Sequence, residues 1–239
     1  MKYLDLTFPT PEHNLACDEA LLDLCEKGYD REILRFWEPQ QYFVVLGYSR
    51  KIHSDVNLSA CQERNIPILR RASGGGTVLQ GPGCLNFSLV LKIENSKPLK
   101  NITETNSFIL NRHKQALEPI VGRTIDVEGL SDLTCKSLKF SGNAQRRRRH
   151  FLLFHGTFLT SFDISFIEQL LPVPSQQPPY RKNRSHTEFL TNLNISAGKI
   201  KETLRSLWLA NESLEHLPTE RIDCLVRERY TSRAWNYKF

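Results

Sequence analysis

Apolar residues recur at helical spacing near the start of the chain and then alternate with polar ones. Leu15, Ala20 and Leu24 lie on one face of a helix expected over 11–28, which Gly28 ends. Alternation around Phe87 predicts a strand at 85–93 with one apolar face. We predict further strands at 32–37, 42–47, 66–71, 77–80, 124–128, 132–135, 138–141, 143–149 and 151–159.

Helical patterns return in the second half of the chain. Thr103 or Thr105 opens a helix near 103–118, and Pro119 stops it because proline lacks the amide donor a helix needs. Shorter helices are predicted at 56–64, 164–171, 196–209 and 217–230, and the four prolines of 171–179 predict a loop. A strand-rich middle with helices at both ends predicts a mixed α+β layer fold.

Length and composition predict one globular domain over residues 1–239. The chain is 40% hydrophobic and 24% charged, which is ordinary for such a domain. No apolar run reaches the length of a membrane span, and the N-terminus lacks the apolar core of a signal peptide, so we expect a cytoplasmic protein without membrane contact. The six cysteines are scattered without a CxxC pair, so neither a zinc site nor a disulfide framework is indicated.

The net charge of +6 allows an anionic substrate, an acidic protein partner or nucleic acid. The run from Arg146 to Arg149 is the sharpest basic feature. It lies between two predicted strands and lacks interleaved aromatic residues, so we expect no nucleic-acid binding. A solvated strand end and a docking surface for an acidic acceptor protein are both open for it.

A glycine-rich segment carries the first candidate chemistry. Arg70 and Arg71 precede Ser73, and Gly74–Gly76 lie between two strand-like runs. Consecutive glycines let the backbone approach a ligand closely, and arginines offer planar donor forks to phosphate or carboxylate. The segment is therefore typical of an anion site, although a basic strand end followed by a flexible hairpin has the same composition.

A second segment, Lys139–Gln145, reads Lys-Phe-Ser-Gly-Asn-Ala-Gln and is followed by His155-Gly156-Thr157. Here the chain resembles the lipoate–protein ligase family, within the larger biotin/lipoate ligase and octanoyltransferase superfamily. The other matching pieces, in the family's order, are Asn14-Leu15-Ala16, Asp18–Leu22, Val45-Leu46-Gly47, Arg70–Val78, Gly81–Ser88 and Ser131-Asp132-Leu133. The resemblance covers about residues 1–195, and the ordered set is more specific than any one motif.

The resemblance implies a fold and a reaction. The fold is a central mixed, largely antiparallel sheet flanked by helices, like the biotin ligases and class II aminoacyl-tRNA synthetases. The reaction activates lipoate with ATP and Mg²⁺ to lipoyl-AMP and transfers the lipoyl group to a lysine. No tightly bound prosthetic group is expected. The implied acceptors are lipoyl domains of 2-oxoacid dehydrogenases or the glycine cleavage H protein. The chain has no room for the family's full C-terminal accessory domain, so an accessory subunit is an open alternative.

The resemblance also assigns roles to residues. Lys139 matches the family's active-site lysine, whose ammonium can contact both the acyl carbonyl and the α-phosphate; by position alone it could be an edge-strand lysine. The predicted substrate-binding residues are Arg70, Ser73, Gly74, Gly75, Gly76, Asn86 and His155. The predicted nucleotide-binding residues are Thr77, Val78, Asp132, Asn143 and Ala144, with Asp132 also the predicted Mg²⁺ ligand. Structural roles stay open for Asn86, Asp132 and His155, and Arg71 is expected to be structural or rim-facing.

Two other functions remain open. Octanoyltransferases of this superfamily form a thioester on a cysteine and need no ATP, and Cys135 lies only four residues before Lys139. The region after the His-Gly motif, where one branch carries that cysteine, has none here. A non-catalytic lipoyl-domain binder is the third possibility, and the presence of Lys139, Arg70 and the glycines argues against it.

Overall fold

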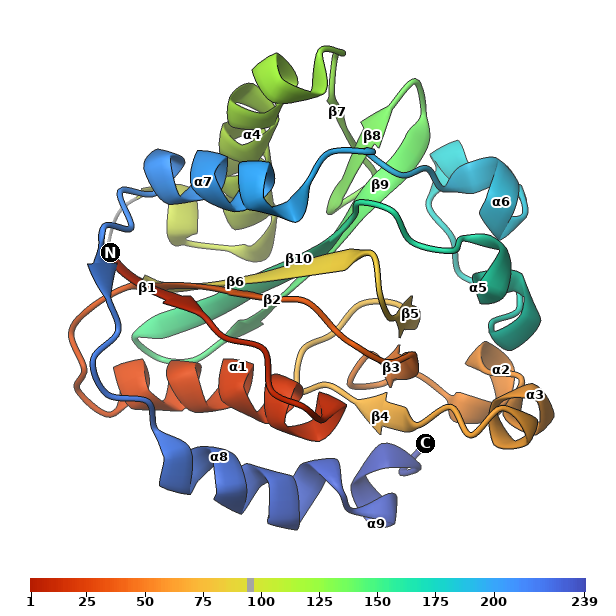
Figure 1. Ribbon diagram of the computed structural model, residues 1–239, viewed down its shortest axis with the longest axis horizontal. Coiled ribbons are helices and arrows are strands. Elements are labelled where there is room, and N and C mark those ends of the chain that lie inside the picture. Colours follow the sequence, from red (N-terminus) through yellow and green to blue (C-terminus); the bar gives the residue numbers. More distant parts are fainter. Residues whose placement is uncertain (94–96) are drawn as a thin grey trace.

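A mixed sheet forms the centre of the protein in the computed structural model, which describes residues 1–93 and 97–239 (Figure 1). Its strands lie in the order β11 (Glu212–Ser213), β1 (Lys2–Asp5), β2 (Ile33–Trp37), β6 (Cys84–Lys92), β10 (Phe151–Leu159), β9 (Leu138–Arg147), β8 (Asp132–Cys135) and β7 (Asp126–Glu128). Strand β1 runs parallel to β11 and β2, and the other neighbouring pairs are antiparallel. The expected mixed, largely antiparallel sheet is confirmed.

A second, three-stranded sheet holds the glycine-rich segment. Strand β3 (Phe43–Leu46) lies between β4 (Ile68–Arg70), to which it is parallel, and β5 (Val78–Gln80), to which it is antiparallel. The glycine-rich segment joins β4 to β5. Helices α2 (Ile52–Asp55), α3 (Leu58–Glu63) and α5 (Ser165–Leu170) share an apolar cluster with this sheet.

Helices cover both faces of the large sheet (Figure 1). One face carries α4 (Ile102–Val121) and α7 (Ala197–Leu207); the other carries α1 (Pro11–Glu26), α8 (Thr219–Leu225) and the π-helical segment η3 (Val226–Tyr230). Successive side chains of β10 pack on opposite faces of the sheet. Leu152 and Phe154 lie in the α4/α7 core, and Phe151 and Leu153 lie in the α1 core. Within the described residues, no helix is both long and apolar enough to cross a bilayer.

Several predicted boundaries are corrected by the structure. Helix α4 begins after Asn101, whose side chain accepts from the Glu104 amide, and it continues through Pro119 to Gly122. Proline is tolerated there because it lies in the last turn, and Gly122 then ends the helix in the left-handed conformation, with φ 67°. The two strands predicted at 138–141 and 143–149 form the single strand β9, and the helix predicted at 217–230 splits into α8 and η3.

Sequence patterns missed the shortest elements. These are β1, β11, α2, the helices α6 (His186–Phe189) and α9 (Arg233–Asn236), and the 3₁₀ turns η1 (Lys97–Leu99) and η2 (Pro179–Arg181). Each spans five residues or fewer, which is too short for a hydrophobic period to develop.

Candidate functional site

Lys139 forms an ion pair at the outer end of the large sheet. Its Nζ lies 2.8 Å from Asp132 Oδ1, on the neighbouring strand β8. The side chain of Lys139 is 24% exposed and that of Asp132 is 11% exposed, so the pair faces a partly desolvated surface. A cation held this way is oriented rather than free to sample solvent.

A local irregularity in β9 brings this pair together. Leu133 pairs with Ser141 while Thr134 pairs with Lys139, so Phe140 is an extra residue between the two registers. The extra residue turns the Lys139 side chain to the face that Asp132 and Gly142 share. A Cβ at Gly142 would lie 2.9 Å from Lys139 Nζ, so glycine leaves the space that the ammonium occupies. The bulge predicted at Gly142 lies instead at Phe140, and the close contact at Gly142 is with the Lys139 side chain, not with backbone.

Tyr180, in η2, holds the second oxygen of Asp132. Its hydroxyl donates to Asp132 Oδ2 at 2.7 Å. Burial and the neighbouring Asp132 carboxylate raise the pKa of Tyr180, so it stays a hydroxyl donor. Tyr180 thus fixes the carboxylate that fixes Lys139.

Arg71 supports the glycine-rich segment from beneath. It donates to Gly74 O at 2.7 Å and Gly76 O at 2.9 Å, and it is 8% exposed. Burial lowers the pKa of Arg71 to about 10. Gly75 has φ 92° and a Cβ there would meet the Arg71 guanidinium at 2.8 Å, so the turn requires glycine. Gly74, Gly75 and Gly76 are all exposed, whereas the Arg71 side chain that binds their carbonyls is buried.

Arg70 is buried and bonded to the backbone of two other segments. Its guanidinium donates to the carbonyls of Gly47, Tyr48, Arg50, Trp235 and Asn236. Its own amide donates to Asn236 Oδ1. The structure therefore gives Arg70 an internal role, tying the loop after β3 to α9, and its contact with substrate stays a prediction.

Ser73 and His155 meet above helix α1. Ser73 Oγ lies 2.6 Å from His155 Nε2, and His155 Nδ1 lies 3.7 Å from Asp18 Oδ2. Asp18 in turn pairs with Arg35, whose Nη1 is 2.5 Å from Oδ1. Burial raises the pKa of Asp18, but Arg35 and His155 outweigh it and the net shift is downward, so Asp18 is ionised.

The other residues predicted to contact substrate or nucleotide bind other side chains of the protein or lie within a strand. Thr77 donates to Asp55 at 2.6 Å, and Val78 begins β5. Asn86 donates to Gln80 and accepts from Thr157, forming a closed ring of three polar side chains. This ring favours the structural interpretation of Asn86, and its ligand contact stays a prediction.

Asn143 and Ala144 lie on opposite faces of β9. Asn143 donates from Nδ2 to Ser131 O at 2.8 Å, and its Oδ1 lies where a Cβ on Gly156 would stand. Ala144 faces the glycine-rich segment, 3.5 Å from the position of a Cβ on Gly75. Of the two, Ala144 is the one that the structure brings to the loop.

Metal binding rests on Asp132 alone. Within the described residues, no group of three or more His, Cys, Asp or Glu side chains could hold a metal ion. Mg²⁺ commonly takes one or two carboxylates and completes its shell with water and substrate phosphates, so one aspartate fits such a role. Both oxygens of Asp132 already have partners, and the metal contact stays a prediction.

The cysteine nearest to Lys139 in the sequence faces away from it. Cys135 is 4% exposed and packs in the α4/α7 core, on the face opposite the Lys139 side chain. Burial raises the pKa of Cys135, which disfavours the thiolate that a nucleophile needs. Burial also raises the pKa values of Cys17, Cys25, Cys61 and Cys84.

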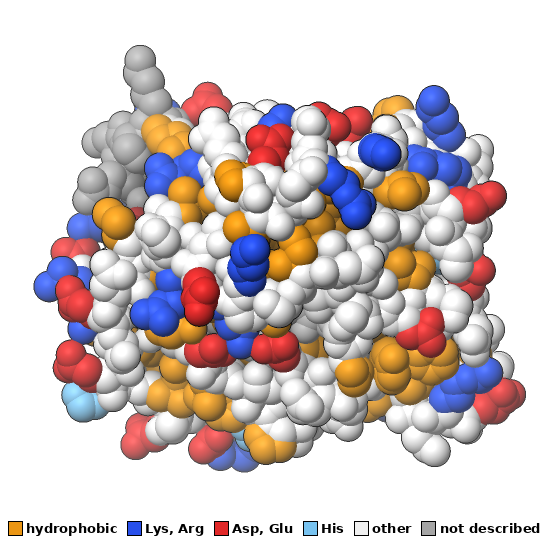
Figure 2. Space-filling model, turned by 45° about the horizontal axis from the view of Figure 1, so that its top comes forward, with side chains coloured by type: hydrophobic (Ala, Val, Ile, Leu, Met, Phe, Trp, Pro, Cys, Tyr) orange, Lys and Arg blue, Asp and Glu red, His pale blue; other side chains and the backbone are white. Residues whose placement is uncertain are grey.

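The side chains of Arg146, Arg147 and Arg148 bind internal partners. Arg146 donates to Ala72 O at 2.8 Å, Arg147 donates to Leu99 O at 2.6 Å, and Arg148 pairs with Asp23 at 3.1 Å. The run therefore anchors the end of β9 to neighbouring elements, in line with the strand-end interpretation. On the face shown in Figure 2, basic and acidic side chains are interspersed.

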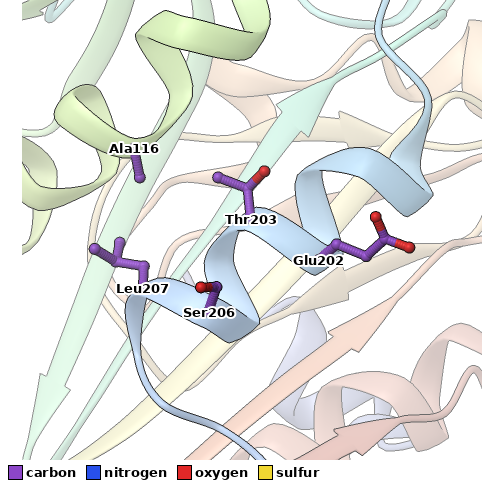
Figure 3. Close-up of a pocket in the computed structure, with 5 residues that line it drawn as sticks. All are labelled: Ala116, Glu202, Thr203, Ser206 and Leu207. Atoms are coloured by element: carbon purple, nitrogen blue, oxygen red, sulfur yellow. The ribbon is translucent and has the colours of Figure 1, made fainter.

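A hollow of about 470 Å³ lies apart from these residues, between α4 and α7 (Figure 3). It is lined by Ala116, Glu202, Thr203, Ser206 and Leu207. Helices α4 and α7 cover the face of the sheet opposite Lys139, so this hollow is not part of the candidate site.

Sequence reasoning overlooked Arg35, Tyr180 and the part that Asp18 plays. Asn14 and Asp18 stand four residues apart in α1, and both are buried, as are Glu19 and Asp23 of the same helix. Polar residues at helical spacing on a core-facing stripe are the signal that could have found Asp18. Tyr180 carries no such signal, because it follows the proline-rich loop.

The geometry agrees with the family that the sequence motifs indicate. Residues 10–204 match the model of the lipoyl protein ligase A/B catalytic domain, and the chain belongs to this family. The protein is thus an enzyme of a family that includes lipoate–protein ligases and octanoyltransferases.

The relatives carry both activities in their names. The probable lipoate-protein ligase A of Mycoplasma pneumoniae is 28% identical over 249 residues, covering 99% of this chain and 72% of the relative. The octanoyltransferase LipM of Brevibacillus brevis is 25% identical over 274 residues, covering 99% and 98%. Sequence similarity alone therefore does not separate ligase from transferase.

Solved structures share the fold. A lipoate-protein ligase A crystallised with ATP superimposes with a TM-score of 0.84 at 23% identity, covering 99% of this chain and 98% of that one. The bi-partite lipoate protein ligase from Thermoplasma acidophilum, studied with its E2 lipoyl domain, gives 0.83 at 22%, covering 99% and 95%.

Proposed function

We propose that this chain is an ATP-dependent lipoate–protein ligase. It activates lipoate with ATP and Mg²⁺ to lipoyl-AMP and transfers the lipoyl group to a lysine of a lipoyl-acceptor domain. The single observation that carries the proposal is the oriented Lys139 ammonium, held over Gly142 by Asp132, while the neighbouring thiol of Cys135 faces the opposite, apolar core.

The chemistry follows from where charge develops. When a carboxylate attacks the α-phosphorus, negative charge grows on phosphate oxygens, and when an amine attacks the anhydride it grows on the acyl oxygen. A preorganised cation at that point stabilises both, and removing one such donor typically costs about 10²–10³ in rate. Lys139 is that cation, and the exposed glycines beside Ala144 allow the nucleotide to approach backbone.

The acceptor is a folded lipoyl domain, as in 2-oxoacid dehydrogenases or the glycine cleavage H protein. The pairing of the Thermoplasma ligase with its E2 lipoyl domain supports this class of partner. That ligase is bi-partite, which supports testing the present chain with and without an accessory subunit.

The rival function is ATP-independent acyl transfer, favoured by the LipM relatives. Incubating the protein with lipoate and an acceptor domain, with and without ATP and Mg²⁺, separates the two by the acceptor's mass. We expect the lipoyl mass increment only with ATP. Modification from an octanoyl thioester without ATP, with none from lipoate and ATP, would replace the ligase by the transferase.

A further inference from the structure

The transfer step needs a proton acceptor that the ligase chemistry above leaves unassigned. A lysine side chain, with an ordinary pKa near 10.4, arrives mostly as an ammonium, which has no lone pair for attack. Lys139 is itself a cation, and both oxygens of its partner Asp132 are engaged. Arg70 and Arg71 carry donors only.

The imidazole of His155 can accept a proton, because its two nitrogens face different partners. Asp18 is an anion and only accepts, so the neutral ring presents Nδ1–H to Asp18 and leaves Nε2 to accept from the Ser73 hydroxyl. Arg71 Nε donates to Ser73 Oγ at 3.1 Å, which leaves the hydroxyl hydrogen of Ser73 for the bond to Nε2. Ser73 is thus hydrogen-bonded to His155, and the Asp18 carboxylate lies 3.7 Å from the other ring nitrogen, close enough to orient the ring by its charge.

The charged groups beside His155 are more deeply buried than the ring itself. The side chains of Arg35 and Asp18 are 0% and 5% exposed, whereas that of His155 is 15% exposed. Arg35 balances the charge of Asp18, and a proton on His155 would be attracted by the Asp18 carboxylate, 3.7 Å from Nδ1. The carboxylate therefore orients the ring and stabilises the proton once it arrives.

Ser73 and His155 also lie close to the predicted reaction centre at Lys139 and Gly142. On β10 and β9, Thr157 pairs with Gly142 and His155 pairs with Ala144, so the two pairs are two residues apart on one face. Two residues of strand correspond to roughly 7 Å. The glycine-rich segment lies over the His155–Ala144 pair, since Ser73 binds His155 and a Cβ on Gly75 would lie 3.5 Å from Ala144.

We propose that His155 is the general base of lysine acylation, with Ser73 passing the proton and Asp18 positioning the ring. The amine nitrogen bonds to the acyl carbon, and the bond from that carbon to the phosphate oxygen breaks, releasing AMP. Before this attack, one proton of the ammonium goes to Ser73 Oγ while the hydroxyl hydrogen of Ser73 goes to His155 Nε2. The second N–H proton, lost after the bond to carbon forms, leaves on the phosphate of AMP. Ser73 is 2% exposed, so the proposed transfer requires the acceptor lysine to displace part of the exposed segment Gly74–Gly76.

The test compares two amines that attack the same acyl donor. The acceptor-domain lysine must lose a proton, whereas hydroxylamine is already unprotonated at neutral pH. The full-length protein is given preformed lipoyl-AMP, so the measurement rests on the proposed function only for the identity of the donor. If wild type accepts only an acyl thioester, the same comparison is run with that donor, and failure of ATP activation is read separately from ATP-dependent pyrophosphate release.

For His155→Gln we expect lysine acylation to fall about 10²-fold or more, with hydroxamate formation within about twofold of wild type. Asp18→Asn should show the same split with a smaller loss. His150→Gln, an exposed histidine in the turn before β10, is the matched control and should change neither rate. Equal losses with both amines in a folded His155→Gln protein, or unchanged lysine acylation, would overturn the proposal.

Discussion

Each face of the central sheet carries a histidine, and the two have opposite surroundings. On the α4/α7 face, His113 is fully buried, packs against Phe87 and Trp208, and accepts from Trp208 Nε1 at 2.9 Å. Burial, with a smaller contribution from Arg112, lowers the pKa of His113 to about 3. On the α1 face, His155 meets Ser73 and Asp18.

The difference teaches how one sheet separates stability from chemistry. The α4/α7 face is a continuous apolar core, and its histidine is locked in the neutral form. The α1 face near the glycine-rich segment instead holds the buried ions Asp18 and Arg35 and, at its outer edge, the Lys139–Asp132 pair. Burying an ion lowers the stability of the fold unless the ion is paired, and these buried ion pairs lie near the candidate site.

The largest expected effect comes from the charged face. Lys139→Ala should reduce lipoyl transfer by roughly 10²–10³ or more, because a single preorganised donor to a developing oxyanion is worth that much. Its thermal midpoint should change little, since the side chain is partly exposed. Acceptor mass and a melting curve check this. Lys199→Ala, an exposed lysine on α7, should match wild type in both; a soluble Lys139→Ala protein with normal turnover would remove Lys139 from the mechanism.

The next effect tests the space beneath that lysine. Gly142→Ala places a Cβ 2.9 Å from Lys139 Nζ and should push the ammonium away from Asp132. A displacement of about 1 Å can cost on the order of 10²-fold in rate, so we expect a loss near that size without unfolding. The control is Gly198→Ala in α7, where a Cβ meets nothing within 4 Å. Unchanged activity in Gly142→Ala would show that the Lys139–Asp132 geometry is not needed.

The apolar face should respond in stability instead of activity. Because the pKa of His113 falls from 6.5 to about 3 on folding, the unfolded chain binds more protons between these pH values. Stability is therefore lost as pH falls below 6.5, at up to roughly 1.4 kcal/mol per pH unit from this residue. His113→Gln keeps an acceptor for Trp208 and does not titrate. Urea unfolding at about pH 7 and pH 5 should show a smaller acid loss in the variant; equal losses would contradict the assignment.

The smallest effect is expected at the thiol on the apolar face. Cys135→Ala should leave lipoyl transfer within about twofold of wild type, because the buried thiol points away from Lys139. The cost should appear only in stability, at about 1 kcal/mol, as for a small core truncation. An acyl adduct on Cys135 in wild type, together with loss of transfer in the variant, would establish the thioester route.

Sequence patterns predicted the parts of this picture that repeat or match a motif. The long helix α1, the alternating strand β6 and the α+β class followed from periodicity. The mixed, largely antiparallel sheet, Lys139 and the roles of the glycines followed from the family resemblance that the ordered motifs carry. Periodicity could not place Pro119 inside a helix, because its last turn is fixed by packing and by Gly122. It also could not give Arg70 its backbone partners in α9, which lie 165 and 166 residues away.

The hydrogen bonds that position the candidate site residues also join segments far apart in the sequence, so they could not be predicted. Tyr180 reaches Asp132 across 48 residues, and Ser73 reaches His155 across 82. Neither separation leaves a local pattern, so only the folded chain reveals that these polar groups form pairs.

The adenylate route is tested most directly by following one oxygen atom. If lipoate labelled with oxygen-18 in its carboxyl group is activated through lipoyl-AMP, the oxygen left behind on transfer stays on the α-phosphate. Mass spectrometry of AMP from a single turnover with ATP and acceptor domain should then show one labelled oxygen per lipoyl group transferred. Lipoylated acceptor accompanied by unlabelled AMP, or formed without AMP, would contradict the proposed ligase.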